Sequence, residues 1–368
     1  MPVHKIVVTG GPCGGKTTAL SRIKIELSRL GYTVLVVPES ATQLISNGIT
    51  PWGCITTKDY QRCQMRLQVY KEQIYDEAAA VIPSDKIVIV CDRGMLDNRA
   101  YMTDEEFCDV LAEQGWSEVA LRESYDAVFH LVSCARGAEK YYQLENNGAR
   151  YESLEEAREM DDSFIAAWAS HPYYRIIDNS TGFEEKMDRL IKEVVYFLGE
   201  HMERRIEHKY LIGYPDLAWL EALPSSGKIN IVQTYLRSEP DREVRLRSRG
   251  TNDDDCVYYL TEKQIEGEDK RLLHQRHLNK GEYRMMLHQA DPDRREIRKT
   301  RYSFTHGNLY IDVDVYPCWD DQAVAKVEVS SEDAVVCLPE ELHVIREITG
   351  EEAYRDSVMA SQAFGATH

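Results

Sequence analysis

The chain has 368 residues, 43% of them hydrophobic, which suits one large or two ordinary globular domains. Its net charge of −18 argues against a general affinity for nucleic acid; no run has the roughly 18 apolar residues of a membrane span, and we expect a cytoplasmic protein without a signal peptide. The nine cysteines are scattered without a C-x-x-C pair, which indicates reduced thiols and not a disulfide framework or a zinc site.

The first predicted element is a short apolar strand over residues 5–9, followed by a glycine-rich loop and a helix over residues 16–30. The loop fits G-x-x-x-x-G-K-[ST] at every fixed position, and strand–loop–helix is the context that identifies a P-loop. Glycines let backbone N–H groups turn towards phosphates, and the helix N-terminus adds partial positive charge. We expect Lys16 to reach the β- and γ-phosphates of a nucleoside triphosphate and Thr17 to bind Mg²⁺. The predicted nucleotide-binding residues of the loop are Gly11, Pro12, Cys13, Gly14, Gly15, Lys16, Thr17 and Thr18.

A second apolar run over residues 33–38 ends at Glu39. A strand, a helix and a strand after a P-loop predict an α/β domain with a parallel sheet and helices on both faces, with ligands at the carboxyl ends of the strands. Glu39 lies at such an end, where P-loop nucleoside kinases place the carboxylate that accepts the proton of the attacking hydroxyl. A charge at a helix N-cap is the alternative for Glu39, and both interpretations stay open.

The clearest buried strand is predicted over residues 86–91, after short and long helical patterns over residues 41–47 and 58–81. It ends in Asp92 and Arg93. An apolar strand that ends in aspartate is a Walker B arrangement, so we expect Asp92 to hold Mg²⁺ directly or through water. Arg93 is a candidate to contact the acceptor or the phosphates, and a structural ion pair is its alternative.

A fourth strand is predicted over residues 127–132, and a charged segment follows over residues 136–168. This segment has the place and polarity of a mobile lid, in which Arg136 and Arg150 would close on the phosphates. The alternative is a solvated helix pair with internal Glu–Arg pairs. A fifth strand over residues 174–177 leads to Asp178 and Asn179, predicted to hydrogen-bond a purine base without deciding between ATP and GTP.

A long helix over residues 183–207 is expected to close the first domain. Beyond it, seven strand-like runs alternate apolar with charged residues and predict an antiparallel sheet with one charged concave face. Basic side chains that clasp phosphates, with carboxylates that position Mg²⁺, would make a site for a phosphate chain; a solvated outer face is the alternative. The charged residues of these runs are Glu207, Lys209, Arg245, Arg247, Lys299, Arg301, Asp312, Asp314 and Glu328.

Several motifs carry a resemblance to a known family, among them Ile206-Glu207-His208-Lys209, Val244-Arg245-Leu246-Arg247, Tyr259-Leu260-Thr261-Glu262-Lys263 and Arg298-Lys299-Thr300-Arg301-Tyr302. With the P-loop and the tail Arg346-Glu347-Ile348-Thr349-Gly350, they make the chain similar to the family of the TRPL translocation defect protein. The resemblance implies an AAA-type, kinase-like P-loop domain over residues 1–204. It further implies a CYTH-like β-barrel, or triphosphate tunnel, over residues 205–368, with Lys263 among its ligand-binding residues.

The family resemblance also implies ligands: GTP or ATP in the first domain, and an inositol phosphate, phosphoinositide headgroup or polyphosphate in the second. Arg205 and Lys326 depart from the tunnel pattern, because each stands where that pattern has a metal-binding glutamate. A tunnel without those oxygens is expected to bind phosphates and to hydrolyse them poorly.

The leading hypothesis is a Mg-NTP-binding protein with a phosphoryl-transfer or NTPase site, in which Lys16, Glu39, Asp92, Arg93 and Arg150 carry the chemistry. Three alternatives remain: a small-molecule kinase whose second domain supplies the acceptor, a non-catalytic nucleotide-controlled switch, and a triphosphatase in the tunnel domain. Peripheral contact with a membrane surface is compatible with each of them.

Overall fold

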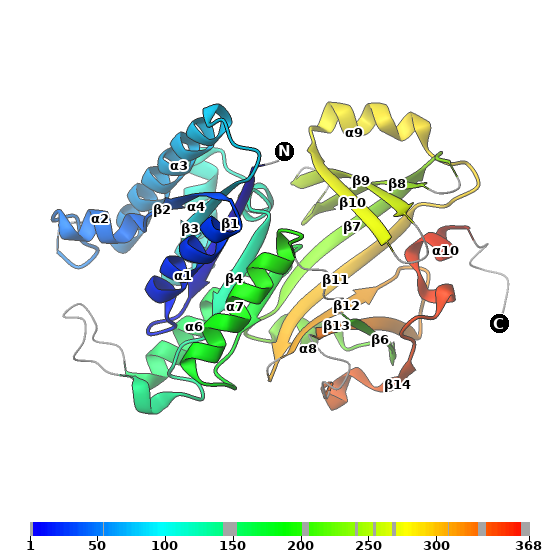
Figure 1. The fold of residues 1–368 in the computed structure, drawn as a ribbon. Coiled ribbons are helices and arrows are strands. Elements are labelled where there is room, and N and C mark those ends of the chain that lie inside the picture. The colour runs from blue at the N-terminus through cyan, green and yellow to red at the C-terminus, as the bar shows by residue number, and fades with distance from the viewer. Residues whose placement is uncertain are drawn as a thin grey trace. The chain divides into compact units, whose positions relative to one another are not determined.

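The computed structural model describes residues 3–53, 55–142, 153–200, 206–239, 242–252, 255–266, 270–307, 309–329 and 336–361. The chain divides into two compact units, Met1–Arg204 and Arg205–His368 (Figure 1). Each unit is built on a sheet of its own.

The first unit contains a parallel sheet of five strands in the order β2-β3-β1-β4-β5. The P-loop strand β1 is central, between β3 and β4. All five strands fall on predicted runs, and their mostly buried side chains suit a sheet that is covered on both faces. The strands are β1 (His4–Gly10), β2 (Thr33–Val37), β3 (Ile87–Asp92), β4 (Ala127–Leu131) and β5 (Tyr174–Ile177).

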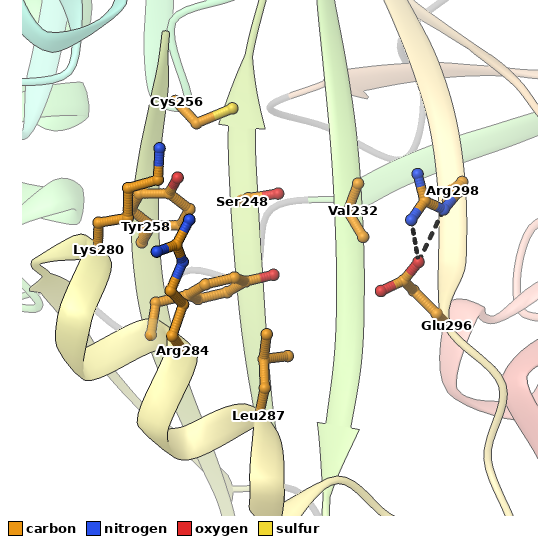
Figure 2. A pocket seen from close by; sticks show the side chains of 10 residues that line it. Val232, Ser248, Cys256, Tyr258, Lys280, Arg284, Leu287, Glu296 and Arg298 are labelled. Carbon is orange, nitrogen blue, oxygen red and sulfur yellow. Dashed lines mark hydrogen bonds and ion pairs between the residues drawn. The ribbon is translucent and has the colours of Figure 1, made fainter. Parts of the chain in front are cut away.

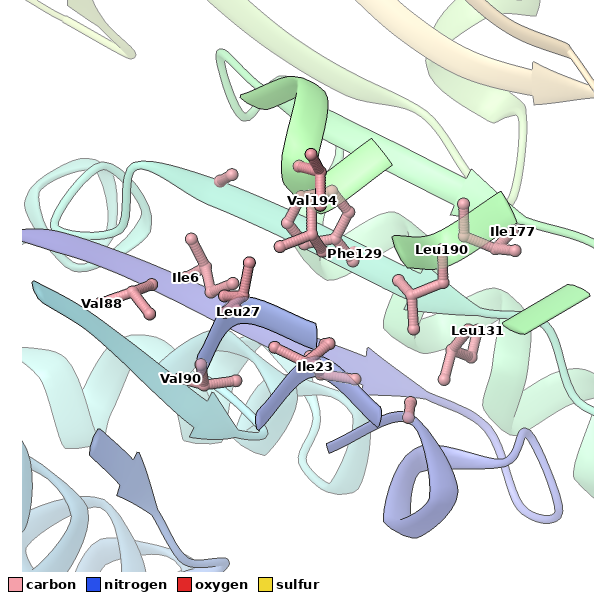
Figure 3. Packing of buried hydrophobic residues seen from close by; sticks show 14 of the residues in the cluster. Ile6, Ile23, Leu27, Val88, Val90, Phe129, Leu131, Ile177, Leu190 and Val194 are labelled. Atoms are coloured by element: carbon pink, nitrogen blue, oxygen red, sulfur yellow. The ribbon is translucent and has the colours of Figure 1, made fainter. Parts of the chain in front are cut away.

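Helices cover both faces of this sheet, as expected for parallel strands. Ile23 and Leu27 of α1 and Leu190 and Val194 of α7 pack on one face, around Phe129 (Figure 3). Helices α3 and α6 contact strands of the sheet from the other side. The helices are α1 (Lys16–Arg29), α2 (Ser40–Ser46), α3 (Thr57–Val81), α4 (Asp104–Gln114), α5 (Glu118–Arg122), α6 (Leu154–Trp168) and α7 (Phe183–Phe197), with 3₁₀ segments η1 (Met95–Tyr101) and η2 (Glu139–Tyr141).

Two expectations for the end of this unit are corrected. The helix predicted over residues 183–207 ends at Phe197, where Gly199 takes a positive φ of 76° that ends a helix readily. Glu207 lies in a strand instead. Part of the predicted lid is a packed helix, because α6 buries Phe164 and Trp168 completely.

The second unit contains a sheet of nine strands in the order β10-β9-β8-β7-β11-β12-β13-β6-β14, with antiparallel pairing throughout the described residues. Pairing runs from β10 to β14, and closure into a barrel stays a prediction. The strands are β6 (Ile206–Gly213), β7 (Gly227–Leu236), β8 (Arg242–Gly250), β9 (Cys256–Glu266), β10 (Lys270–Leu278), β11 (Ile297–His306), β12 (Leu309–Val315), β13 (Gln322–Val329) and β14 (Val344–Glu347).

The two faces of this sheet differ in chemistry. On one face Tyr302, Phe304, Val313 and Ala325 form an apolar core with Leu220. The alternate residues of the same strands carry the charged side chains, as period-two alternation predicts. The remaining elements of the unit are α8 (Leu217–Ala222), α9 (Lys280–Met286), η4 (Leu287–Gln289), η5 (Glu340–Leu342), η6 (Glu352–Tyr354) and α10 (Asp356–Ser361).

Candidate functional site

The loop between β1 and α1 has a backbone that requires glycine. Gly10 and Gly15 have φ values of 143° and 96°. A Cβ atom at Gly10 would lie 2.1 Å from the carbonyl oxygen of Leu131, and one at Gly14 would lie 2.6 Å from the same atom. Cys13 also has a left-handed backbone, with φ 56°. Such strained non-glycine residues concentrate at functional sites.

Lys16 opens α1 and folds back over the loop. Its Nζ donates to the carbonyl oxygen of Gly10 at 2.9 Å and to that of Gly11 at 3.4 Å. Burial and the nearby Arg93 guanidinium lower the pKa of Lys16 to about 8. Thr17 and Thr18 are exposed in the first turn of α1, where backbone N–H groups have no partner within a helix. The predicted phosphate-binding residues are therefore together on one loop and one helix start.

Asp161 of α6 supports the P-loop by accepting hydrogen bonds from the backbone. Its Oδ1 accepts the N–H of Gly11 at 2.9 Å and that of Ser133 at 3.3 Å, and lies 3.0 Å from His130 Nε2. The side chains of Asp161 and His130 are fully buried. Burial alone would raise the pKa of Asp161, but His130 and these backbone donors hold it below its usual value. The sequence analysis did not identify Asp161, because 150 residues separate it from Gly11.

A second support comes from α7 and the loop after β5. Lys186 Nζ donates to the carbonyl oxygens of Val132 at 2.7 Å and Gly14 at 3.2 Å. It also donates to Asn179 Oδ1 at 2.7 Å, and Asn179 Nδ2 donates to the carbonyl oxygen of Arg136 at 2.7 Å. Both ends of the Asn179 amide thus contact the protein.

Asp178, the other predicted base contact, also has partners within the chain. Its Oδ1 accepts from the Ser180 hydroxyl at 2.6 Å and lies 2.9 Å from Arg189 Nη2. Base contacts by Asp178 and Asn179 stay a prediction.

Glu39 and Arg93 meet at the carboxyl ends of β2 and β3. Arg93 Nε donates to Glu39 Oε1 at 2.7 Å, and the Thr42 hydroxyl donates to Glu39 Oε2 at 2.5 Å. Although burial opposes it, Arg93, Thr42 and Lys16 together lower the pKa of Glu39. Glu39 occupies the N-cap position of α2, but its side chain caps no backbone N–H there. The carboxylate instead bonds to Arg93 and to the Thr42 side chain in the first turn of α2.

Arg93 is itself tightly positioned. Its backbone has a left-handed φ of 70°, and its guanidinium lies 4.6 Å from the centre of the Phe164 ring. Asp97 Oδ2 lies 3.7 Å from Arg93 Nη1, and the same carboxylate accepts from Thr9 and Trp168. Arg93 thus lies in ion pairs with Glu39 and Asp97, and its contact with an acceptor or with phosphates stays a prediction.

Asp92 is the last residue of β3, and one of its carboxylate oxygens is a candidate metal ligand. Its Oδ1 is buried and accepts no hydrogen bond from the described residues. Burial and the neighbouring Glu39 carboxylate raise the pKa of Asp92 to about 6, against the opposing effect of Lys16 and Arg93. A buried carboxylate oxygen without a donor fits a divalent cation, and Mg²⁺ takes one or two carboxylates together with phosphate oxygens.

The structure describes one of the two predicted lid arginines. Arg136 follows β4 and donates to Asp162 of α6, and its side chain is 42% exposed. Arg150 lies outside the described residues.

The charged face of the second unit is centred on Asp314, whose side chain is fully buried. Its carboxylate lies 2.7 Å from Arg301 Nε, 3.0 Å from Lys299 Nζ and 2.9 Å from Lys326 Nζ. Although burial opposes ionisation, these three cations hold the pKa of Asp314 well below its usual value. Lys326, which departs from the tunnel pattern, is thus one of the three cations paired with the Asp314 carboxylate.

Arginines on β8 extend this face. Arg247 Nη2 donates to Gln233 Oε1 at 2.7 Å, which is a neutral acceptor. Burial and the neighbouring Arg245, Arg249 and Arg301 lower the pKa of Arg247 to about 9. Burial is the larger cause of this shift, and the neighbouring guanidinium groups add positive potential around Arg247.

The remaining predicted residues lie on the same face. Glu207 Oε1 is 3.1 Å from Lys209 Nζ on β6, and Lys263 Nζ is 3.5 Å from Glu243 Oε1. Arg301 Nη1 donates to Asp312 Oδ2 at 2.7 Å. Glu328 is exposed and is the register partner of Glu207. Arg205, the other departure, lies outside the described residues. Nowhere in the described part of the chain do three His, Cys, Asp or Glu side chains converge as a metal site.

A pocket of about 350 Å³ lies elsewhere, on the opposite face of β7, β8 and β9 (Figure 2). Its floor includes Val232 and Ser248, which pair across the strands, whereas Gln233 and Arg247 point to the charged face. Lys280 and Arg284 of α9 line one side, and the Glu296–Arg298 ion pair lines the other. None of the predicted site residues lines this pocket.

Residues 5–186, which contain the P-loop, match a family model described as an AAA domain. No curated protein matches the chain.

Two solved structures resemble parts of the chain. The hypothetical protein NE1496 is 24% identical over 43% of this chain and 99% of its own, with a TM-score of 0.33. The inorganic triphosphatase NE1496 is 25% identical over 44% of this chain and 97% of its own, with a TM-score of 0.32.

Among the described residues, no helix combines the length and apolarity needed to cross a membrane.

Proposed function

We propose that the first unit binds a nucleoside triphosphate with Mg²⁺ and transfers or hydrolyses its terminal phosphoryl group. The observation that carries the proposal is the buried Oδ1 of Asp92, which accepts no hydrogen bond from the described residues and lies near Lys16, Arg93 and Glu39. Lys16 would neutralise the β- and γ-phosphates, and the first turn of α1 would bind their oxygens. Thr17 and Asp92 would hold Mg²⁺, which neutralises phosphate charge when bound.

Glu39 is the proposed proton acceptor for the attacking oxygen. Arg93 and Thr42 fix both of its oxygens, and its lowered pKa keeps it ionised at neutral pH. Arg93 Nη1 is buried without a hydrogen-bond partner, so the guanidinium retains donor capacity for a phosphate oxygen. Arg136 and Arg150 would complete the charge stabilisation as lid residues.

The Mg²⁺ assignment is tested by calorimetric titration of ATP and GTP with and without MgCl₂. Wild-type protein is expected to bind more tightly with MgCl₂, and Asp92→Asn is expected to lose that gain. Asp85→Asn, an exposed residue before β3, is the matched control and should behave as wild type. An unchanged MgCl₂ effect in Asp92→Asn would contradict the assignment.

We further infer that the charged face of the second unit binds a phosphorylated anion, such as an inositol phosphate, a phosphoinositide headgroup or a polyphosphate. The supporting observation is Arg247, which is buried among other arginines and bonded to the neutral Gln233. A phosphate would relieve this concentration of positive charge. Because Lys326 forms an ion pair with the Asp314 carboxylate, we favour anion binding at this face over metal-assisted triphosphate hydrolysis.

Titration with inorganic tripolyphosphate and with inositol hexakisphosphate tests the second site. Arg247→Ala is expected to weaken binding, and Arg237→Ala, an exposed arginine after β7, is expected to leave it unchanged. Flotation with phosphoinositide-containing vesicles distinguishes a lipid headgroup from a free phosphate. Equal affinities for wild type and Arg247→Ala would contradict the proposed site.

A further inference from the structure

Helix α10 brings an acidic side chain onto the charged face. Asp356 Oδ2 accepts from Lys299 Nζ at 2.7 Å and from Gln233 Nε2 at 2.6 Å. Its Oδ1 accepts from the Tyr316 hydroxyl at 2.9 Å. The donors lie on β11, on β7 and directly after β12. One carboxylate near the end of the chain is thus the common acceptor for three separate parts of the sheet.

The surroundings of Asp356 strongly favour an anion. Its side chain is only 14% exposed. Lys299 and Lys326 nevertheless keep the pKa of Asp356 far below its usual value, against the effect of burial. Gln233 connects the carboxylate to Arg247, since its amide donates to Asp356 and accepts from Arg247. The position of Asp356 is therefore where this face concentrates its attraction for negative charge.

Asp356 differs from Asp314, the other buried carboxylate of the cluster, in how its backbone is held. Asp314 lies within β12, which is paired with a strand on each side. Asp356 lies on a six-residue helix that packs through Met359 and Ala360 and accepts one backbone bond, from Arg295 N to the Ala360 carbonyl oxygen at 2.8 Å. Asp356 can leave without opening the sheet, whereas Asp314 cannot.

We propose that the Asp356 carboxylate occupies a phosphate subsite, and that a polyphosphorylated ligand binds by displacing Asp356 together with α10. The inference rests on the proposed anion-binding function of the second unit. A phosphate group presents charged oxygen acceptors to the same donors, namely Lys299 Nζ, Gln233 Nε2 and the Tyr316 hydroxyl. Asp356 then selects against ligands with a single phosphate, because only a ligand that also engages Arg247 gains enough to replace an internal carboxylate.

The test is calorimetric titration of the full chain with inorganic tripolyphosphate. Asp356→Asn keeps the size of the side chain and removes the competing charge, so we expect its dissociation constant to fall at least about tenfold. Asp320→Asn, an exposed change in the same unit, is the matched control and should equal wild type. Equal or weaker binding by Asp356→Asn would overturn the inference.

A second measurement uses the wild-type protein and does not depend on any variant's folding. Saturating tripolyphosphate is expected to speed hydrogen exchange at the backbone amides of residues 356–361. Unchanged or slower exchange there, with binding established, would overturn displacement. Vesicles that contain a doubly phosphorylated phosphoinositide form a parallel arm, and a gain for Asp356→Asn with either ligand source supports the subsite.

The two proposals fail differently. If tripolyphosphate and the vesicles bind neither wild type nor Asp356→Asn, the anion-binding function itself is refuted and the subsite with it. If both proteins bind equally and Arg247→Ala does not, the anion site stands and only the role of Asp356 is refuted.

Discussion

Two residues of the P-loop site have pKa values moved from opposite sides towards neutrality. Burial and Glu39 raise the pKa of Asp92 to about 6, while burial and Arg93 lower that of Lys16 to about 8. Both groups carry their charges at the same time only between these two pKa values. Such paired shifts are typical of functional sites, because the site places like charges together in a poorly solvated space.

The affinity for Mg-nucleotide is accordingly expected to be highest between about pH 6 and about pH 8. Below this window Asp92 gains a proton and loses its charge for the metal; above it Lys16 loses a proton and its charge for phosphate. Titrations from about pH 5 to about pH 9 measure the profile. Lys16→Arg should lose the alkaline limb, because arginine stays charged. A flat wild-type profile would contradict these assignments.

Glu39→Gln separates an enzyme from a nucleotide-controlled switch. If Glu39 accepts the proton of the attacking oxygen, the variant should bind nucleotide within about twofold of wild type and lose roughly 10²–10⁴ in phosphate release. Glu105→Gln, an exposed change on α4, serves as the reference. Turnover that survives Glu39→Gln would remove the catalytic role of Glu39, whereas nucleotide binding without turnover in both proteins would favour the switch.

At the scale of elements, the P-loop depends on helices far away in the sequence. Asp161 of α6 accepts the Gly11 N–H, and Lys186 of α7 donates to the Gly14 carbonyl oxygen. The loop itself follows from a contiguous motif, so sequence patterns predict it well. The contacts from Asp161 and Lys186 cannot be predicted in this way. A lone aspartate in an amphipathic helix has no distinguishing sequence pattern until the fold brings it to the loop.

Asp161→Asn is expected to loosen the P-loop without unfolding the sheet. An amide oxygen at the Oδ1 position is a weaker acceptor for the Gly11 N–H than a carboxylate, and an NH₂ group at the Oδ2 position cannot accept the Ser133 N–H. A loss of about 1–2 kcal/mol would weaken nucleotide binding by about tenfold. Calorimetry measures this against Glu159→Gln, an exposed change on the same helix. Equal affinities would contradict the supporting role of Asp161.

Element boundaries show the same division between local and distant information. Period-two alternation predicted seven of the strands in the second unit, since it depends on neighbouring residues. It missed β10, which pairs with the preceding strand β9, and β14, which pairs with the distant strand β6. The helix predicted through residue 207 failed for a similar reason: β6 pairs with β13, more than a hundred residues later.

For the whole molecule, the net charge of −18 conceals two local groups of buried or half-buried cations. One includes Lys16 and Arg93 in the first unit, and the other includes Arg247 and Lys299 in the second. Composition argues against a general affinity for nucleic acid, yet it cannot reveal a local anion site. The sequence predicted the cations of both groups, but it missed Asp356, Gln233 and Tyr316, whose importance appears only in their contacts.

The central claim is that two sites hold phosphate compounds: the P-loop around Lys16 and Arg93 holds the nucleotide, and the charged face around Arg247 and Lys299 holds a second compound. Mass spectrometry of the ligands retained by the purified full-length protein, with Lys16→Ala alongside, tests it most directly. The account predicts a guanine or adenine nucleotide that is lost in Lys16→Ala, and a second phosphate compound that the change leaves in place. A wild-type protein that retains no nucleotide and binds none when ATP or GTP is added with Mg²⁺ would contradict the account.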